Sequence, residues 1–82
     1  MTYSSWETLE KDCLSCEKCQ LKNGRTQVVF GTGNRQAKVL FIGEGPGEQE
    51  DKQGKPFVGR SGQYLDKMLA AVGLDRNKDL YI

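Results

Sequence analysis

The stretch that decides the fold reads Val39-Leu-Phe-Ile-Gly-Glu-Gly-Pro-Gly-Glu-Gln-Glu-Asp-Lys-Gln-Gly-Lys-Pro-Phe-Val-Gly-Arg-Ser-Gly62. It opens as an apolar run of strand length, continues as a glycine-rich loop with four carboxylates, and closes on Phe57 just before a helical pattern. Glycines around Pro46 let the backbone approach a ligand closely, and carboxylates this close together repel one another unless they are solvated or used. This layout is typical of an active-site loop.

The segments on both sides of this loop predict a βαβ unit. Residues 37–42 form an apolar run that is continuous enough for a central strand buried on both faces. Apolar residues at helical spacing predict a helix over 62–72, with Ser61 as its N-cap and Gly73 at its C′ position. Residues 80–82 predict a second, parallel strand, which the helix connects to the first. The predicted fold class is therefore α/β.

Shorter elements are expected around this unit. A capping-box pattern predicts a first helix over residues 5–12, with Trp6 as a core anchor. Residues 28–30 predict a short strand, and residues 31–35 a tight turn that leads into the central strand. Residues 75–79 are expected to form a surface loop.

The composition limits the protein to one small domain. A chain of 82 residues buries only roughly 60–65% of its unfolded surface, so its core is expected to be thin. A net charge of +1 argues against a strongly basic nucleic-acid-binding domain. No apolar run approaches the length of a membrane span, and the N-terminus lacks the features of a signal peptide. We therefore expect a soluble, cytoplasmic monomer with no membrane partner.

All three cysteines lie in one motif, Cys13-Leu-Ser-Cys16-Glu-Lys-Cys19. In a reducing compartment such clustering points to thiolate ligation of iron or zinc rather than to disulfides. A closed site of either kind normally has four ligands, whereas this chain has no His and no fourth Cys. At least one ligand is therefore missing, and three free thiols without a metal are the alternative.

The loop after the central strand suggests a particular chemistry. In open α/β sheets, ligands bind beyond the carboxyl ends of the strands, where Gly43-Glu-Gly-Pro-Gly47 lies. The loop lacks the Gly-Lys-Ser/Thr of a phosphate loop, and its carboxylates would repel an anion. Carboxylates suit the orientation of a water, or the stabilisation of positive charge on a sugar as a glycosidic bond breaks. Phe57 offers a face for a stacked base, although a solvated acidic loop and a core Phe remain alternatives.

Taken together, these motifs resemble the iron–sulfur uracil-DNA glycosylases of family 4, the thermostable type. The resemblance covers nearly the whole chain from Cys16 onward, and it rests on Arg25-Thr26, Val29-Phe-Gly31, Gly33-Asn34, Gly43-Glu-Gly-Pro-Gly47, Glu50-Asp51, Gly54, Pro56-Phe-Val-Gly59 and Gly62-Gln63. It implies the βαβ portion of a three-layer parallel-sheet glycosylase fold. Residues 1–82 would be one N-terminal fragment, with the helix and the cysteines in 1–25 and the α/β segment in 26–82.

The resemblance also implies an activity, the hydrolysis of the N-glycosidic bond of deoxyuridine in DNA, with the nucleotide extruded from the duplex. Glu44 and the backbone of Gly45 would border the uracil and the attacking water. The substrate-binding residues would be Gly43, Gly47, Glu50 and Phe57, with Phe57 stacked on the base. Lys55 and Arg60, beside the pocket, would contact DNA phosphates.

The same resemblance implies a cofactor, a [4Fe–4S] cluster with Cys16 and Cys19 as two of its ligands. Cys13 would be an additional thiol and a candidate substitute ligand, and zinc could replace the cluster. Family members carry an Asn, further cysteines and a His-containing motif beyond the position of Ile82, so this chain is expected to be inactive alone. Two other functions stay open: a non-catalytic nucleotide- or DNA-binding appendage of a replication or repair protein, and a small iron–sulfur or zinc module.

Overall fold

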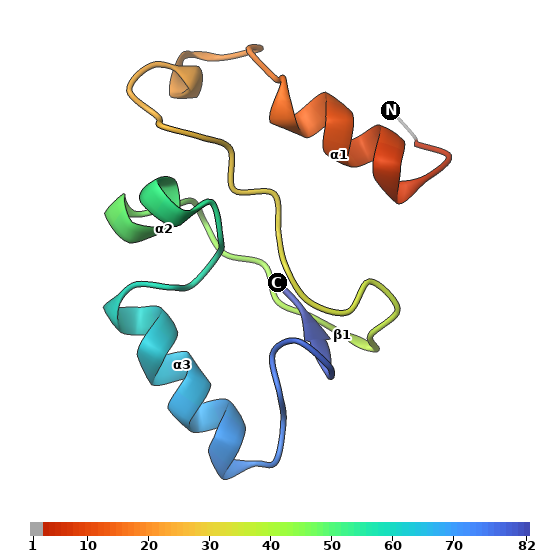
Figure 1. Cartoon of the computed structure of the whole chain (residues 1–82), viewed down its shortest axis with the longest axis vertical. Helices are drawn as coiled ribbons and strands as arrows, with labels where there is room; N and C mark the ends of the chain where they lie inside the picture. The colour runs from red at the N-terminus through yellow and green to blue at the C-terminus, as the bar shows by residue number, and fades with distance from the viewer. Residues whose placement is uncertain (1–2) are drawn as a thin grey trace.

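A computed structural model describes residues 3–82, so the first two residues of the predicted 1–82 fragment lie outside it. Its helices and strands are, in chain order, α1 (Trp6–Leu14), the 3-10 helix η1 (Gln20–Lys22), β1 (Val39–Leu40), α2 (Glu48–Gln53), α3 (Arg60–Ala71) and β2 (Leu80–Tyr81). In Figure 1, α1 and α3 lie at opposite ends of the long axis, with the strands between them. The Cα trace measures 39 × 30 × 16 Å, which leaves room for only a thin core.

The two strands form a parallel pair. Val39 lies opposite Leu80 and Leu40 opposite Tyr81, and Phe41 extends the ladder by donating its N–H to the Tyr81 carbonyl at 2.9 Å. Both α2 and α3 belong to the connection between the strands. The prediction of an α/β unit with two parallel strands is therefore confirmed.

The other edge of β2 is also paired, which the sequence did not predict. Thr32 and Ile82 exchange both backbone hydrogen bonds, at 3.0 and 2.9 Å, and Gly33 forms an antiparallel bridge with Tyr81. The tight turn predicted over 31–35 is therefore wrong in part, because its middle residues pair with β2 and the turn itself comes later.

The helix predicted over 62–72 is confirmed as α3, but it begins two residues earlier, with Gly59 rather than Ser61 as its N-cap. Its end is the predicted glycine stop. Gly73 has φ +78°, and its N–H donates to the Ala70 carbonyl at 3.1 Å, while the next N–H donates to Leu69 at 2.8 Å. This pair of bonds is a Schellman motif, which satisfies the last carbonyls of the helix.

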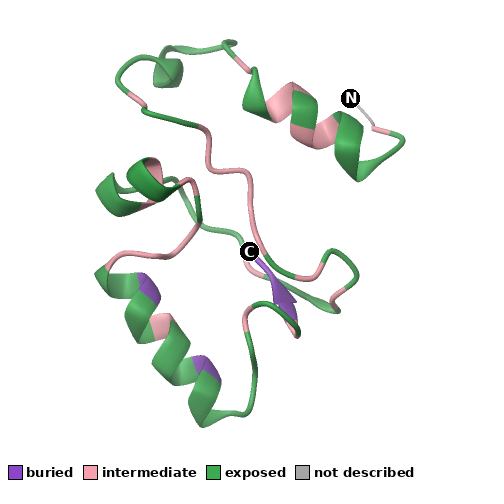
Figure 2. Cartoon of the chain, in the orientation of Figure 1, coloured by how far each residue is buried: buried purple, intermediate pink, exposed green. Residues whose placement is uncertain are grey.

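Burial is confined to a few residues, as Figure 2 shows by the purple on β2 and at two positions of α3. The buried cluster comprises Leu69, Leu80 and Ile82, with Phe41, Phe57 and Leu65 packed against it. The central strand expected over 37–42 is wrong in extent and in burial. Only Val39–Leu40 is strand, and Leu40 is 60% exposed, because no second layer among residues 3–82 covers β1.

Two further predictions differ from the structure. Residues 28–30 form no strand, although all three are half-buried. The acidic part of the loop, expected to be irregular, contains the short helix α2. Its N-cap is Gly47, whose N–H donates to the side chain of Glu50 three residues later, so α2 begins with the carboxylate half of a capping box.

The first helix is confirmed as α1, one residue later than predicted at its start and two at its end. Trp6 anchors it: its ring centroid lies 5.0 Å from that of Tyr81 and 6.2 Å from that of Phe30, and the Arg35 guanidinium lies 5.0 Å from the ring. Trp6 is 37% exposed and α1 has no buried residue, so the prediction that Trp6 lies in the core is wrong, although its ring does anchor the helix. Among residues 3–82, no helix has both the length and the apolar character to cross a membrane.

Leu80→Ala is expected to destabilise the chain severely, because the Leu80 side chain is fully buried in the cluster with Leu69 and Ile82. Leu→Ala substitutions in a core cost about 2–5 kcal/mol, a large part of the stability of a small domain. Urea or thermal unfolding followed by circular dichroism measures the loss. Leu21→Ala is the matched control, since Leu21 is 82% exposed and should change stability by less than about 0.5 kcal/mol. Equal unfolding midpoints for the two variants would contradict the assigned core.

Candidate active site

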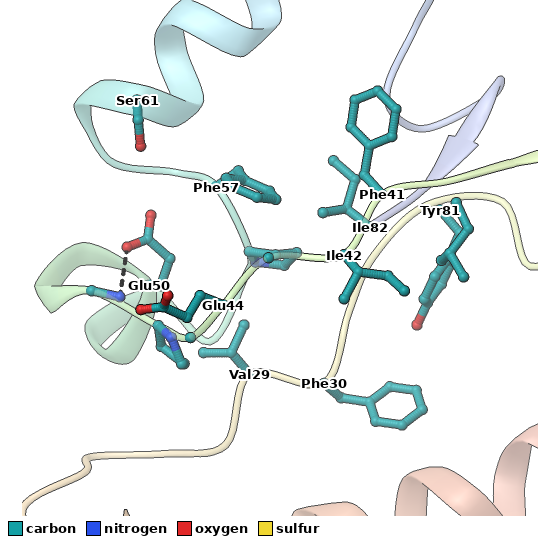
Figure 3. Close-up of a pocket in the computed structure, with 16 residues that line it drawn as sticks. Val29, Phe30, Phe41, Ile42, Glu44, Glu50, Phe57, Ser61, Tyr81 and Ile82 are labelled. Atoms are coloured by element: carbon teal, nitrogen blue, oxygen red, sulfur yellow. Dashed lines mark hydrogen bonds between the residues drawn. The ribbon is translucent and has the colours of Figure 1, made fainter.

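A cavity of about 470 Å³ opens where β1 ends (Figure 3). This is the edge of a parallel sheet at which ligands bind, and the volume suits a small molecule. All six residues predicted for catalysis and substrate binding contribute to it. The lining consists of Val29, Phe30, Leu40, Phe41, Ile42, Gly43, Glu44, Gly45, Pro46, Gly47, Glu50, Pro56, Phe57, Ser61, Tyr81 and Ile82.

Phe57 has an unusual backbone. Its φ is +51°, the only positive value at a non-glycine residue among residues 3–82. The ring lies over Gly43, where an added Cβ would come within 2.9 Å of the ring carbon Cζ. An added Cβ at Gly62 would lie 1.8 Å from the Phe57 carbonyl oxygen. The carbonyl of Phe57 is thus packed against a position, Gly62, that only glycine can occupy, and a side chain at Gly43 would displace the Phe57 ring.

Glu50 holds the loop together through its carboxylate. Oε2 accepts the N–H groups of Val58 and Gly59, both at 2.8 Å, and Oε1 accepts the N–H of Gly47 at 3.0 Å (dashed in Figure 3). One side chain therefore ties the loop before α2 to the loop after it. These donors, Gly59 first and then Val58, lower the pKa of Glu50 below its ordinary value of 4.5, because they favour the charged form.

Glu44 is placed differently. It is exposed, and Figure 3 shows its side chain at the cavity on the same side as Glu50. Within the described part of the chain its carboxylate has no hydrogen bond and no ion pair. Its neighbours Gly43 and Gly45 also line the cavity. Glu44 is thus free to meet a ligand, whereas Glu50 is engaged by the backbone.

The other two carboxylates of the loop have structural partners. Asp51 accepts the N–H of Thr26 at 2.7 Å and that of Gln27 at 3.2 Å, and these bonds lower its pKa below the ordinary 3.8. Glu48 pairs with Lys52 at 3.0 Å on the surface of α2. Asp51 therefore connects α2 to the segment that leads back to the cysteines.

The cysteine segment is held at its backbone. The Cys16 carbonyl accepts a hydrogen bond from Arg25 at 2.7 Å. Cys13 and Cys16 are half-buried and Cys19 is exposed, all as free thiols. Across residues 3–82, no three Cys, Asp or Glu side chains are grouped to hold a metal ion. The three thiols alone therefore do not fit a four-ligand cluster or zinc site.

The two residues predicted to contact DNA are both exposed. Lys55 follows α2 and Arg60 begins α3. Neither has an ion-pair partner in the structure over residues 3–82. Both cations flank Pro56-Phe57 in the sequence, but neither contributes to the lining of this cavity, and Lys55 lines a second cavity instead.

Comparison with known proteins decides the family. Residues 30–82 match the family model of the uracil DNA glycosylase superfamily, and this match contains β1, the cavity loop, α3 and β2. The chain belongs to the uracil-DNA glycosylase superfamily. Within it, the chain is a homologue of the type-4 enzymes, as the sequence motifs indicated.

Two curated type-4 uracil-DNA glycosylases illustrate the similarity. That of Archaeoglobus fulgidus is 45% identical over 78 residues, which cover 95% of this chain and 39% of that protein. That of Thermotoga maritima is 46% identical over 76 residues, covering 93% and 39%. The chain thus spans about two fifths of the length of these glycosylases. It also matches a DNA polymerase of Bacillus phage SP01, at 31% identity over 61 residues that cover 74% of this chain and 7% of the polymerase.

The six residues that the sequence analysis assigned to catalysis and substrate binding all line the cavity. The sequence analysis did not predict that Glu50 and Asp51 accept hydrogen bonds from backbone N–H groups. The spacing between Gly47 and Glu50 is that of a helix N-cap and its N3 residue, which could have revealed α2 and the turned-back carboxylate. No local pattern connects Asp51 to Thr26, because that contact spans 25 residues.

Glu50→Gln is expected to destabilise the chain near neutral pH and to weaken its pH dependence. The folded-state pKa of Glu50 lies below 4.5, so its contribution is fully present above that pH and is lost as the pH falls through the folded-state value. Urea unfolding at about pH 7 and about pH 3.5 should show a gap between wild type and variant that narrows in acid. Glu48→Gln, on the same helix but exposed, is the control. If the stability difference between wild type and Glu50→Gln is the same at both pH values, the charge of Glu50 is not what stabilises its hydrogen bonds to the N–H groups of Gly47, Val58 and Gly59.

Proposed function

We propose that this chain forms one wall of the active site of a uracil-DNA glycosylase that begins base excision repair. The observation that carries the proposal is the single cavity that joins Glu44, Glu50 and Phe57 at the end of β1. Membership of the superfamily supports it. The fold of the whole enzyme would be a three-layer parallel sheet, with residues 1–25 as the cysteine segment and 26–82 as the α/β segment.

In this proposal a deoxyuridine leaves the duplex and its base enters the cavity. Phe57 stacks on the uracil, while Gly43 and Gly47 shape the pocket. Glu44, with the backbone of Gly45, faces the water that attacks C1′. The C1′–N1 bond breaks, the water oxygen bonds to C1′, and uracil leaves with the water proton. A carboxylate here also stabilises the positive charge that develops on the sugar.

The remaining roles concern DNA and the cofactor. Lys55 and Arg60 are exposed cations that would contact backbone phosphates, with the salt dependence of such contacts. For Cys16 and Cys19 we propose ligation of a [4Fe–4S] cluster whose other ligands come from outside residues 1–82. The cluster would tie the cysteine segment to the rest of the enzyme.

One observation favours a second candidate function. The similarity to a phage DNA polymerase extends over 74% of this chain but only 7% of the polymerase. That distribution is what a small module inside a replication protein would produce. A non-catalytic nucleotide- or DNA-binding appendage is therefore the second candidate, and it requires the cavity but no chemistry at Glu44.

A chimera tests the proposed activity. The residues of this chain that align with the Thermotoga maritima type-4 enzyme would replace the corresponding segment of that enzyme, and uracil release from a labelled oligonucleotide would be measured. The chimera should be active, and Glu44→Gln should lower kcat by roughly 10²–10⁴, the usual contribution of a group that activates water. Glu48→Gln, a neighbouring exposed carboxylate, should leave kcat unchanged.

Residues 1–82 alone should release no uracil under the same conditions. Release by the chain alone would show that the part of the type-4 enzymes not covered by this chain is dispensable, and an active chimera insensitive to Glu44→Gln would remove Glu44 from the mechanism.

Phe57→Leu in the same chimera should lower kcat/KM by roughly 5–150-fold, the range that corresponds to about 1–3 kcal/mol of base–aromatic stacking. Phe30→Leu is the control, since Phe30 also lines the cavity but packs edge-on against Trp6. Steady-state kinetics on a single-stranded uracil-containing oligonucleotide provide the measurement. Equal losses for the two variants would mean that the cavity needs only apolar volume and not a stacking face at Phe57.

A further inference from the structure

Phe57 is not held in place by packing alone. Its ring lines the candidate active site, and the residue also lines a second cavity of about 380 Å³, together with Asp66 and Arg76. Phe57 packs against the cluster of Leu69, Leu80 and Ile82, but open space on two sides of the residue leaves it fewer contacts than a fully enclosed residue has. Its left-handed φ of +51° is also uncommon for a residue with a side chain. Some other interaction must therefore hold this conformation.

Arg76 supplies that interaction from the loop between α3 and β2. Its Nη1 donates to the Pro56 carbonyl at 3.0 Å, and its Nη2 donates to the Phe57 carbonyl at 2.8 Å and to Gly62 at 3.4 Å. The side chain is only 16% exposed, and its Nε is bound to Asp66 at 2.7 Å. A planar guanidinium can serve several acceptors in this fixed geometry, which the ammonium of a lysine cannot.

Glu50 holds the same stretch of backbone by accepting hydrogen bonds from its N–H donors, those of Val58 and Gly59. The peptide that joins Phe57 to Val58 donates its N–H to Glu50 at 2.8 Å and accepts from Arg76 through its carbonyl. The preceding peptide, from Pro56 to Phe57, is held through its carbonyl by Arg76. Both peptide planes that meet at the Phe57 Cα are thus fixed, and with them φ, ψ and the direction of the Cβ.

We propose that Arg76 is a positioning residue, which with Glu50 clamps the two peptides around Phe57 and so presents its ring to a base in the cavity. The presentation of the ring to uracil rests on the proposed function, whereas the clamp itself concerns the backbone alone. Charge-assisted hydrogen bonds are the stronger class, so a cation on the carbonyls and an anion on the amides suit a conformation that packing supports only in part.

Arg76→Met in the 82-residue chain tests the clamp by nuclear magnetic resonance. The variant should speed amide hydrogen exchange at Val58 and Gly59 by roughly tenfold or more, as expected for the loss of a hydrogen bond to a charged group. The Cα and Cβ shifts of Phe57 should move away from left-handed values. The amides of Phe41 and Ile82, which bond within the sheet, should keep their protection. Arg35→Met is the matched control, because Arg35 pairs with Glu10 on the α1 side.

Wild-type exchange and Phe57 shifts in Arg76→Met would overturn the proposal, and so would equal changes in Arg35→Met. If Arg76→Met also loses protection in the sheet, Arg76→Lys decides by the same comparison. It keeps the charge but cannot reach all the carbonyls, so Val58 and Gly59 should still exchange faster than in wild type, and wild-type rates there would overturn the clamp.

A titration with free uracil separates the clamp from the proposed function. Uracil should shift the signals of Gly43–Gly47 and Phe57 in the wild-type chain. In Arg76→Met, half-maximal shifts should need a roughly tenfold higher uracil concentration, the same factor by which amide exchange increases. No uracil-induced shift in wild type would count against the proposed function and leave the clamp to the exchange data. Uracil binding unchanged in a variant with a released Phe57 would overturn the positioning role.

Discussion

The structure depends on the pairing of β2 along both of its edges. Parallel bonds to β1 on one side and antiparallel bonds to residues 32–34 on the other leave Leu80, Tyr81 and Ile82 as the most buried consecutive residues. The cavity loop and α3 lie between β1 and β2 in the sequence. The pairing of β2 with β1 therefore closes the connection that contains both of them. Trp6 extends the same dependence to α1, because its ring packs on Tyr81.

Two carboxylates of the acidic loop stabilise the segments outside the sheet by accepting hydrogen bonds from backbone N–H groups. Glu50 and Asp51 are neighbours on α2, yet they accept backbone N–H groups from opposite directions, the first from Val58 and Gly59 and the second from Thr26. Loop segments without sheet partners need such acceptors, because unpaired backbone donors are costly when they are withdrawn from water. Two of the four carboxylates in this acidic loop are thus backbone acceptors, whereas Glu48 pairs with Lys52 on the surface and Glu44 has no hydrogen bond or ion pair among the described residues.

The sequence was sufficient for the elements with the strongest local patterns, but the strands expected over 28–30 and 37–42 were wrong in whole or in part. The period of α3, its glycine stop and the apolar end of the chain predicted the α/β unit, and the resemblance to the family 4 glycosylases named six of the residues that line the cavity. Contacts between residues far apart in the sequence could not be predicted from local patterns. The antiparallel pairing of residues 32–34 with β2 and the reach of Arg76 to Phe57, 19 residues away, leave no periodic signal. Arg76 lies in a segment whose composition predicts only a surface loop, since a charged residue there looks the same whether or not it binds carbonyls.

Phe57 and Glu44 line the same cavity under opposite degrees of restraint, and the role that we propose for each accounts for the difference. Stacking depends on a ring being parallel to the base at contact distance, so an aromatic that must find its orientation after binding loses conformational entropy at that moment. Fixing its backbone beforehand removes that cost. A carboxylate that faces a developing positive charge acts through an electrostatic interaction that varies more gradually with distance and direction. It can therefore sit between two glycines without a fixed partner, which also keeps it from being neutralised by a neighbour before the substrate arrives.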